Sequence, residues 1–154
     1  MSFLARVATA LESAGVRYAL VGGFAVALHG AVRGTVDVDV ILAWDARSLR
    51  AAEEALKGIG LVSRLPITAD EVFQFRDEYI RNRSLIAWNF YNPKDLTEQL
   101  DIVISTDLKG KRVEKIRTGE GTLRVLARKD LIAMKRASGR PQDLADVAAL
   151  EKLP

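Results

Sequence analysis

The chain has 154 residues, 49% of them hydrophobic and 28% charged, a balance that is typical of a globular domain and excludes a disordered chain. The absence of cysteine excludes a disulfide framework and a thiolate zinc site, and the single histidine excludes a histidine-rich metal site. A formal net charge of +3 is compatible with a phosphate-bearing ligand or an RNA partner, but it is too small to indicate either.

The N-terminal part of the chain predicts two helices around a short buried strand. Residues 3–11 carry apolar side chains at helical spacing, and Gly15 is a natural helix stop. Residues 17–21 predict a buried strand, and the next segment, 22–30, predicts a short helix that opens with two glycines. The longest apolar run falls here and is shorter than the roughly 20 residues of a membrane span. With no signal-peptide core at the N-terminus, a cytoplasmic protein without a membrane partner is predicted.

The remaining elements alternate between strands and helices. A strand is expected at 35–42, and Asp45 is placed to cap a helix over 46–57. The elements expected next are a strand at 61–65, a helical turn capped by Thr68 or Asp70, and strands at 84–90 and 99–105 separated by the turn 92–95. The last ones are a hairpin near Gly119 and Gly121 with its outgoing strand at 124–127, a helix at 129–137, and a helix at 143–153 with Pro141 in its first turn. No repeat or linker interrupts this order, which predicts one α/β domain over residues 1–154.

Two aspartates, Asp37 and Asp39, interrupt an otherwise apolar strand. Because side chains alternate along a strand, the two carboxylates share one face about 7 Å apart, and the valines 36, 38 and 40 share the other. Magnesium ions prefer oxygen ligands, and two metal ions can stabilise both oxygens of a phosphoryl displacement. The alternative is an edge strand whose acidic face points at water; the all-valine opposite face favours a central strand instead.

A glycine pair, Gly22-Gly23, lies between the first strand and the second helix. Such a turn lets backbone N–H groups approach a phosphate, although many strand-to-helix turns use glycine for geometry alone. The order of strand, Gly-Gly turn, helix and acidic strand places a phosphate-accepting turn beside a metal-binding strand.

The stretch "VGGFAVALHG…RGTVDVDVIL" resembles the opening of the polymerase-beta-type nucleotidyltransferase superfamily, whose signature is a Gly-Gly or Gly-Ser turn followed by D-x-D or D-x-E. More narrowly, it is similar to the small stand-alone members grouped with the AbiEii toxin-like nucleotidyltransferases. The resemblance implies a nucleotidyltransferase-like mixed sheet flanked by helices, with further helices at the C-terminus. It also implies that a nucleoside triphosphate is the substrate.

The resemblance further implies a third carboxylate on a neighbouring strand. Asp101, within "EQLDIVIS", is the candidate; the alternative is a strand-edge aspartate beside a polar turn. In the family reading, Asp37, Asp39 and Asp101 hold Mg²⁺, in a two-metal site, and Asp101 helps to deprotonate the acceptor hydroxyl.

The C-terminal stretch "LIAMKRASGRPQDLADVAALE" resembles the K-x-x-A-x-x-x-R-x-x-D-x-x-D segment of AbiEii-like proteins, although the lysine-to-arginine spacing here is five. By this resemblance Lys135 contacts nucleotide phosphates, and Arg140 orients the triphosphate or an acidic side chain. Asp143 and Asp146 are three positions apart and therefore share a helix face. Their alternative role is capping and pairing with Arg140 or Lys135.

Two residues just before the acidic strand, Arg33 and Thr35, are candidates for phosphate contact. Arg33 alternatively neutralises the acidic cluster. The only histidine, His29, ends the short helix, where packing or capping is the simpler role.

These observations predict a magnesium-dependent nucleotidyltransferase that moves a nucleoside monophosphate to an acceptor hydroxyl. The acceptor is an RNA end such as that of tRNA, a protein side chain or a small molecule such as an aminoglycoside. The AbiEii resemblance favours a toxin of a toxin–antitoxin pair, with an antitoxin or accessory subunit as partner. The alternative is a non-catalytic nucleotide-binding or partner-binding module of the same fold, against which the presence of all three candidate acids argues.

Overall fold

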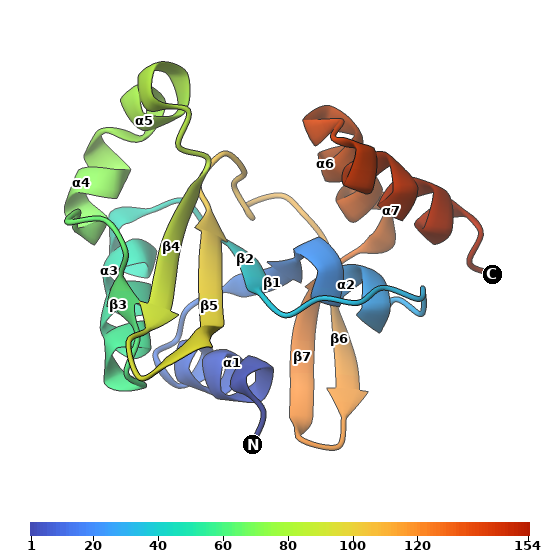
Figure 1. Ribbon diagram of the computed structural model, residues 1–154, viewed down its shortest axis with the longest axis horizontal. Coiled ribbons are helices and arrows are strands. Elements are labelled where there is room, and N and C mark those ends of the chain that lie inside the picture. The colour runs from blue at the N-terminus through green and yellow to red at the C-terminus, as the bar shows by residue number, and fades with distance from the viewer.

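A computed structural model describes residues 1–154 and contains seven helices and seven strands (Figure 1). The helices are α1 (Phe3–Ser13), α2 (Gly22–Leu28), α3 (Ala46–Gly58), α4 (Ala69–Gln74), α5 (Arg76–Arg83), α6 (Arg128–Ser138) and α7 (Pro141–Glu151). The strands are β1 (Tyr18–Val21), β2 (Val38–Leu42), β3 (Val62–Ser63), β4 (Ala87–Asn92), β5 (Asp95–Val103), β6 (Val113–Thr118) and β7 (Gly121–Leu126).

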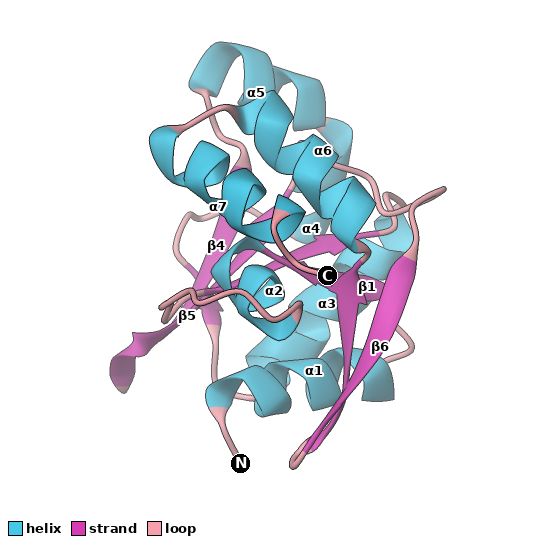
Figure 2. Ribbon diagram, turned by 90° about the vertical axis from the view of Figure 1, so that its right-hand side faces the viewer, coloured by secondary structure: helices cyan, strands magenta, loops and turns pink.

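All seven strands form one mixed sheet in the order β3-β4-β5-β2-β1-β7-β6. Strand β2 is the central one, as the valine pattern predicted; it pairs antiparallel with β1 and parallel with β5. Helices α4 and α5 lie toward the β3–β4 side of the sheet, whereas α6 and α7 lie toward the β7–β6 side (Figure 1). In the view turned by 90°, α6 and α7 lie side by side above α2 (Figure 2), and the two helices pack against each other.

The helix caps follow the local sequence signals. Asp45 accepts a hydrogen bond from the Ser48 backbone N–H at 2.7 Å, which confirms the predicted cap of α3. Thr68, rather than Asp70, is the N-cap of α4, where it forms a reciprocal capping box with Glu71. The predicted turns at residues 92–95 and 119–121 both close antiparallel hairpins.

The acidic strand is shorter than its sequence predicts. The expected strand at 35–42 begins only at Val38, so Asp37 precedes the strand and the Val36 side chain, 65% exposed, is not on a buried face. The reason is the length of the neighbouring strand: β1 ends at Val21, directly opposite Asp39, and the chain turns into α2 there. Residues 35–37 therefore have no β1 partner and remain a loop.

Helix α5 has no counterpart among the predicted elements. None of its side chains is buried, so the segment lacks the apolar stripe from which a helix is recognised. It ends at Ser84 in the left-handed conformation (φ 51°), which delays the strand predicted at 84–90 until Ala87. The strand predicted at 61–65 is reduced to Val62–Ser63. No helix is long and apolar enough to cross a bilayer.

Candidate functional site

A cleft of 950 Å³ opens where β1, β2 and β5 approach α6 and α7. All nine residues that the sequence predicts for the site line this cleft, although they come from distant parts of the chain. They are Gly22, Gly23, Arg33, Thr35, Asp37, Asp39, Asp101, Lys135 and Arg140. The structure thus brings the predicted residues together, while the role of each stays a prediction.

Two of the candidate carboxylates, Asp39 and Asp101, lie next to each other on neighbouring strands. Asp39 of β2 and Asp101 of β5 are register partners on parallel neighbouring strands, which lie about 4.8 Å apart. Burial, followed by the negative charges of Asp101 and Asp37, raises the pKa of Asp39 to about 7 from its ordinary 3.8. Lys135 and Arg140 act in the opposite direction, but their positive charges do not outweigh burial and the two carboxylates, so the cluster keeps an excess of negative charge.

Two carboxylates of the cluster, those of Asp39 and Asp101, are suited to bind a divalent cation. All the donors are carboxylate oxygens, which suit Mg²⁺, and magnesium sites in proteins commonly take one or two carboxylates and complete the shell with water and substrate phosphates. The structure contains no group of three or more His, Cys, Asp or Glu side chains arranged to hold one metal ion. Asp39 and Asp101 are the pair in register, whereas Asp37 is exposed in the loop before β2.

The glycine pair is packed against this cluster. Gly22 begins α2 with φ +71°, and a Cβ at this position would lie 2.2 Å from Oδ2 of Asp39. A Cβ at Gly23 would lie 2.7 Å from the Cβ of Thr35. Both glycines are therefore required by close packing, one against the metal-ligand candidate and the other against the loop that precedes β2.

We expect Gly22→Ala to damage the site more than the fold. A side chain there is strained by the positive φ and displaces the Asp39 carboxylate, so folding should lose about 1–3 kcal/mol and the nucleotidyl transfer predicted from the sequence should fall at least ~10-fold. Gly34→Ala is the matched control, because nothing lies within 4 Å of a Cβ there. Urea unfolding and initial rates of both variants test the prediction, which fails if the two behave alike.

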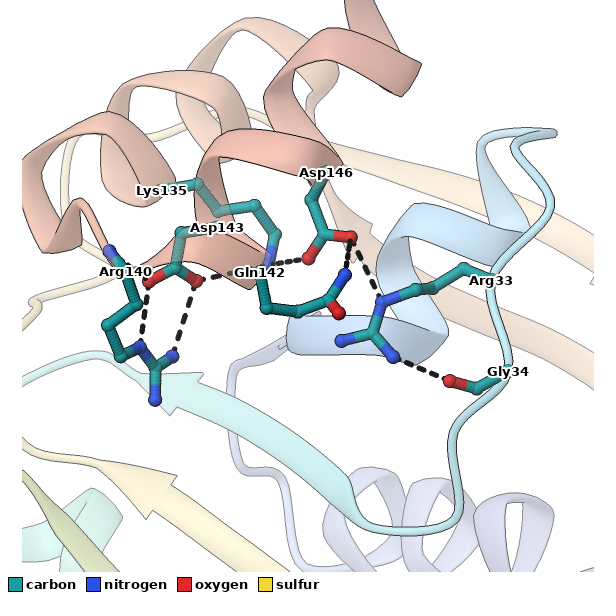
Figure 3. Close-up of polar contacts among 7 residues, drawn as sticks. All are labelled: Arg33, Gly34, Lys135, Arg140, Gln142, Asp143 and Asp146. Carbon is teal, nitrogen blue, oxygen red and sulfur yellow. Dashed lines mark hydrogen bonds and ion pairs between the residues drawn. The ribbon is translucent and has the colours of Figure 1, made fainter.

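Three basic residues of the cleft, Arg33, Lys135 and Arg140, are held by two buried aspartates (Figure 3). Nζ of Lys135 lies 2.8 Å from Oδ2 of Asp146 and 3.8 Å from Oδ1 of Asp143. Nε of Arg140 donates to Oδ2 of Asp143 at 2.7 Å, and Nε of Arg33 donates to Oδ1 of Asp146 at 2.9 Å. The capping and pairing roles that the sequence left open for Asp143 and Asp146 are thus present in the structure, and Arg33 pairs with Asp146 rather than with Asp37 or Asp39.

These contacts keep the two aspartates ionised. Burial alone would raise the pKa of Asp143, but the hydrogen bonds from Arg140 and Ser138 lower it to about 2. Burial also opposes ionisation of Asp146, yet the hydrogen bonds from Lys135, Gln142 and Arg33 lower its pKa. The cleft wall therefore has cations oriented by fixed carboxylates, an arrangement that can hold a polyphosphate.

Two site residues were not anticipated from the sequence. Asn89 of β4 donates from Nδ2 to Oδ1 of Asp101 at 2.8 Å, and Gln142 donates to Oδ1 of Asp146 at 3.0 Å. Asn89 had a detectable signal, since it is a polar residue between the buried aromatics Trp88 and Phe90. His29, for which packing or capping was expected, is the C-cap residue of α2, and its Nε2 lies 2.7 Å from the Leu126 carbonyl oxygen.

Comparison with known proteins gives a family and a fold. A family model described as "Nucleotidyltransferase of unknown function (DUF6036)" matches residues 4–152, whereas no curated protein sequence matches the chain. The lincomycin-bound lincosamide antibiotic adenylyltransferase LnuA is similar with a TM-score of 0.60 and 15% identity over 93% of this chain and 90% of that chain.

Two further solved structures share the architecture. The antibiotic-resistance factor ANT(2'')-Ia, also solved in complex with adenylyl-2''-tobramycin, is similar with a TM-score of 0.61 and 10% identity over 96% of this chain and 80% of that chain. An antigenic nucleotidyltransferase-like protein from Paracoccidioides brasiliensis has a TM-score of 0.55 and 16% identity over 96% of this chain and 72% of that chain. These likenesses confirm the predicted mixed sheet flanked by helices.

Proposed function

The chain belongs to the nucleotidyltransferase family DUF6036, and from this premise we propose that it moves a nucleoside monophosphate from a nucleoside triphosphate to an acceptor hydroxyl in the cleft. The observation that carries the proposal is the pairing of Asp39 with Asp101 beside Gly22, opposite Lys135 and Arg140 across one cleft. An anionic pair facing a cationic wall suits a polyphosphate that arrives with divalent metal.

Each of the predicted site residues has a role in this proposed reaction. Asp39 and Asp101, with Asp37 at the rim, would hold magnesium, which when bound neutralises the carboxylates and the developing charge on the phosphate. Lys135 and Arg140 bind the β- and γ-phosphates, and the Gly22-Gly23 turn, with Thr35 and Arg33 beside it, admits the polyphosphate close to the backbone.

The covalent change is a single in-line displacement. Asp101 accepts the proton of the acceptor hydroxyl, whose oxygen forms a bond to the α-phosphorus. The bond between the α-phosphorus and the bridging oxygen breaks, and pyrophosphate leaves toward Lys135 and Arg140. The cationic side chains are placed to stabilise the charge of the leaving group.

We propose a small hydroxylated molecule as the acceptor. Two structures with this fold, LnuA and ANT(2'')-Ia, are antibiotic-modifying or antibiotic-resistance proteins, and a cleft of 950 Å³ has room for a nucleotide and a second small molecule. The AbiEii resemblance supports another acceptor class, RNA or protein, with an antitoxin or accessory subunit as partner. A direct transfer experiment separates the two.

Transfer of label from α-labelled nucleoside triphosphates tests the function and the acceptor together. The chain is incubated with Mg²⁺ and, separately, with total tRNA, with cell-extract protein, and with hydroxylated small molecules that include an aminoglycoside and a lincosamide. We expect label on the small-molecule fraction, and none with Asp39→Asn. Label on RNA or protein would support the toxin reading, whereas magnesium-dependent nucleotide binding without any transfer would support the non-catalytic module.

A further inference from the structure

Asp101 is in contact with a polar residue of the neighbouring strand, Asn89, which does not line the cleft. Asn89 of β4 is the direct register partner of Asp101 of β5. Its Nδ2 donates to Oδ1 of Asp101 at 2.8 Å and makes a longer contact of 3.5 Å with Oε1 of Gln99. The side chain is half-buried and lies outside the residues that line the cleft.

The other end of the same amide is held by Arg64. Nε of Arg64 donates to Oδ1 of Asn89 at 2.7 Å, and the Arg64 backbone N–H donates to the Asn89 carbonyl oxygen at 2.9 Å. The Arg64 guanidinium also lies over the Tyr91 ring, 4.5 Å from its centroid. Three independent contacts therefore place the arginine next to Asn89.

The amide orientation in this chain of contacts is unambiguous. A guanidinium can only donate hydrogen bonds and an ionised carboxylate can only accept them. An amide between the two must turn its oxygen to Arg64 and its nitrogen to Asp101, as found. Neither aspartate nor leucine at position 89 could satisfy both neighbours.

We propose that Asn89 is a positioning residue for Asp101, and that Arg64 acts through Asn89 by holding its amide in the donating orientation. The inference rests on the proposed function, which assigns Asp101 to the metal and the acceptor hydroxyl. With Oδ1 engaged by Asn89, the Asp101 carboxylate is fixed in rotation and Oδ2 is the oxygen left for the cleft. Such outer partners orient metal-binding carboxylates in many sites.

The first test compares two asparagines of the same hairpin. Asn89→Leu removes the bond to Asp101, whereas Asn92→Leu removes a matched amide–carboxylate bond, from Nδ2 of Asn92 to Oε1 of Glu98 at 2.9 Å, away from the cluster. Mn²⁺ binding is measured by the paramagnetic resonance of free Mn²⁺. We expect Asn89→Leu to weaken Mn²⁺ affinity by about 10- to 100-fold and Asn92→Leu to leave it unchanged.

Steady-state kinetics give a second readout. Asn89→Leu should lower kcat by about 10- to 100-fold with little change in the KM for the nucleoside triphosphate, because Lys135 and Arg140 are untouched. If Asn89 had a purely structural role, Asn89→Leu would instead lower the melting temperature and the fraction of active enzyme, and the active fraction would keep its wild-type kcat. Unchanged Mn²⁺ affinity in Asn89→Leu, or a wild-type chain that binds no Mn²⁺, would overturn the inference.

Arg64 supplies a variant whose folding is not at risk, since its side chain is exposed. Arg64→Met should weaken Mn²⁺ affinity several-fold, and Arg64→Lys, which keeps a donor, should restore part of it. In an Asn89→Leu background, Arg64→Met should have no further effect, because its influence passes through the amide. Additive losses would show that Arg64 acts on its own and would overturn that part of the proposal.

Failure of the inference and failure of the proposed function are distinguishable. If the wild-type chain transfers no nucleotide to any acceptor, the function fails, yet the Mn²⁺ comparison of the two asparagines still reports on Asn89. If transfer occurs and is lost in Asp39→Asn but is normal in Asn89→Leu, with normal Mn²⁺ affinity, the function holds and the positioning role is wrong.

Discussion

Asp39→Asn should abolish nucleotidyl transfer and, in the same protein, make the metal-free fold more stable. The variant removes a negative charge from the centre of the carboxylate cluster and keeps the side-chain shape. Several kcal/mol of charge stabilisation should be lost from the transition state, which corresponds to a rate reduction of about 10³-fold or more. The stability gain follows because burial, Asp101 and Asp37 already penalise ionisation of Asp39.

The stability gain should depend on pH. The pKa of Asp39 is about 7 in the folded chain against an ordinary 3.8, so between these pH values the folded chain binds more protons than the unfolded one. The free energy of unfolding of the metal-free wild-type chain therefore falls as pH rises from about 4 to 7. Above pH 7 Asp39→Asn should be more stable than wild type by on the order of 2–4 kcal/mol, and this difference should disappear toward pH 4.

Urea unfolding in the presence of a chelator, at several pH values, measures this difference. Asp37→Asn is the matched control, because the Asp37 side chain is exposed and Asp37 is the smallest of the three causes that raise the pKa of Asp39; its replacement should therefore stabilise the chain much less than Asp39→Asn. Added Mg²⁺ should stabilise the wild-type chain more than Asp39→Asn. If Asp39→Asn and the wild-type chain were equally stable at pH 8, the excess of negative charge that we infer around Asp39 would be contradicted.

Lys135→Met should produce the largest loss of stability, together with loss of activity. The Lys135 side chain is 8% exposed and pairs with Asp146 and Asp143, which are themselves buried. Its removal leaves two buried carboxylates with fewer partners, which typically costs about 3–5 kcal/mol. Arg33, Gln142 and Arg140 retain some of their contacts to these aspartates, so we expect a loss near the lower end of that range.

The loss should shrink in acid. The pKa values of Asp143 and Asp146 are lowered in the fold, that of Asp143 to about 2, so their stabilising contribution is present above the ordinary 3.8 and is lost as pH falls toward 2. Arg136→Met is the matched control, since Arg136 pairs with Glu151 on the exposed surface and such pairs contribute about 0–1 kcal/mol. Chemical unfolding at pH 7 and pH 3 distinguishes the two variants; similar losses in both would contradict the buried role of Lys135.

Local sequence patterns were sufficient for most elements and for proposing part of the candidate site. The glycine pair, the alternation from Val38 onward around Asp39, and the cap at Asp45 depend on neighbours within a few positions, so they can be recognised without a fold; at α4 the sequence left Thr68 and Asp70 open. The family resemblance added Asp101, Lys135 and Arg140. Helix α5 was not predicted, because it buries no side chain. The start of β2 at Val38 was predicted too early, because it depends on where β1 ends.

The sequence by itself determined which chemical groups this protein has and the local elements that present them, because those elements are set by short-range periodicity, caps and turn residues. Only the tertiary structure decided which groups meet. The parallel pairing of β2 with β5 places Asp101 beside Asp39, and the packing of α7 over the loop before β2 joins Asp146 to Arg33 across 113 positions. Burial then sets the charge of each group, because the pKa of a carboxylate depends on its solvent and its neighbours in space, which no local pattern specifies.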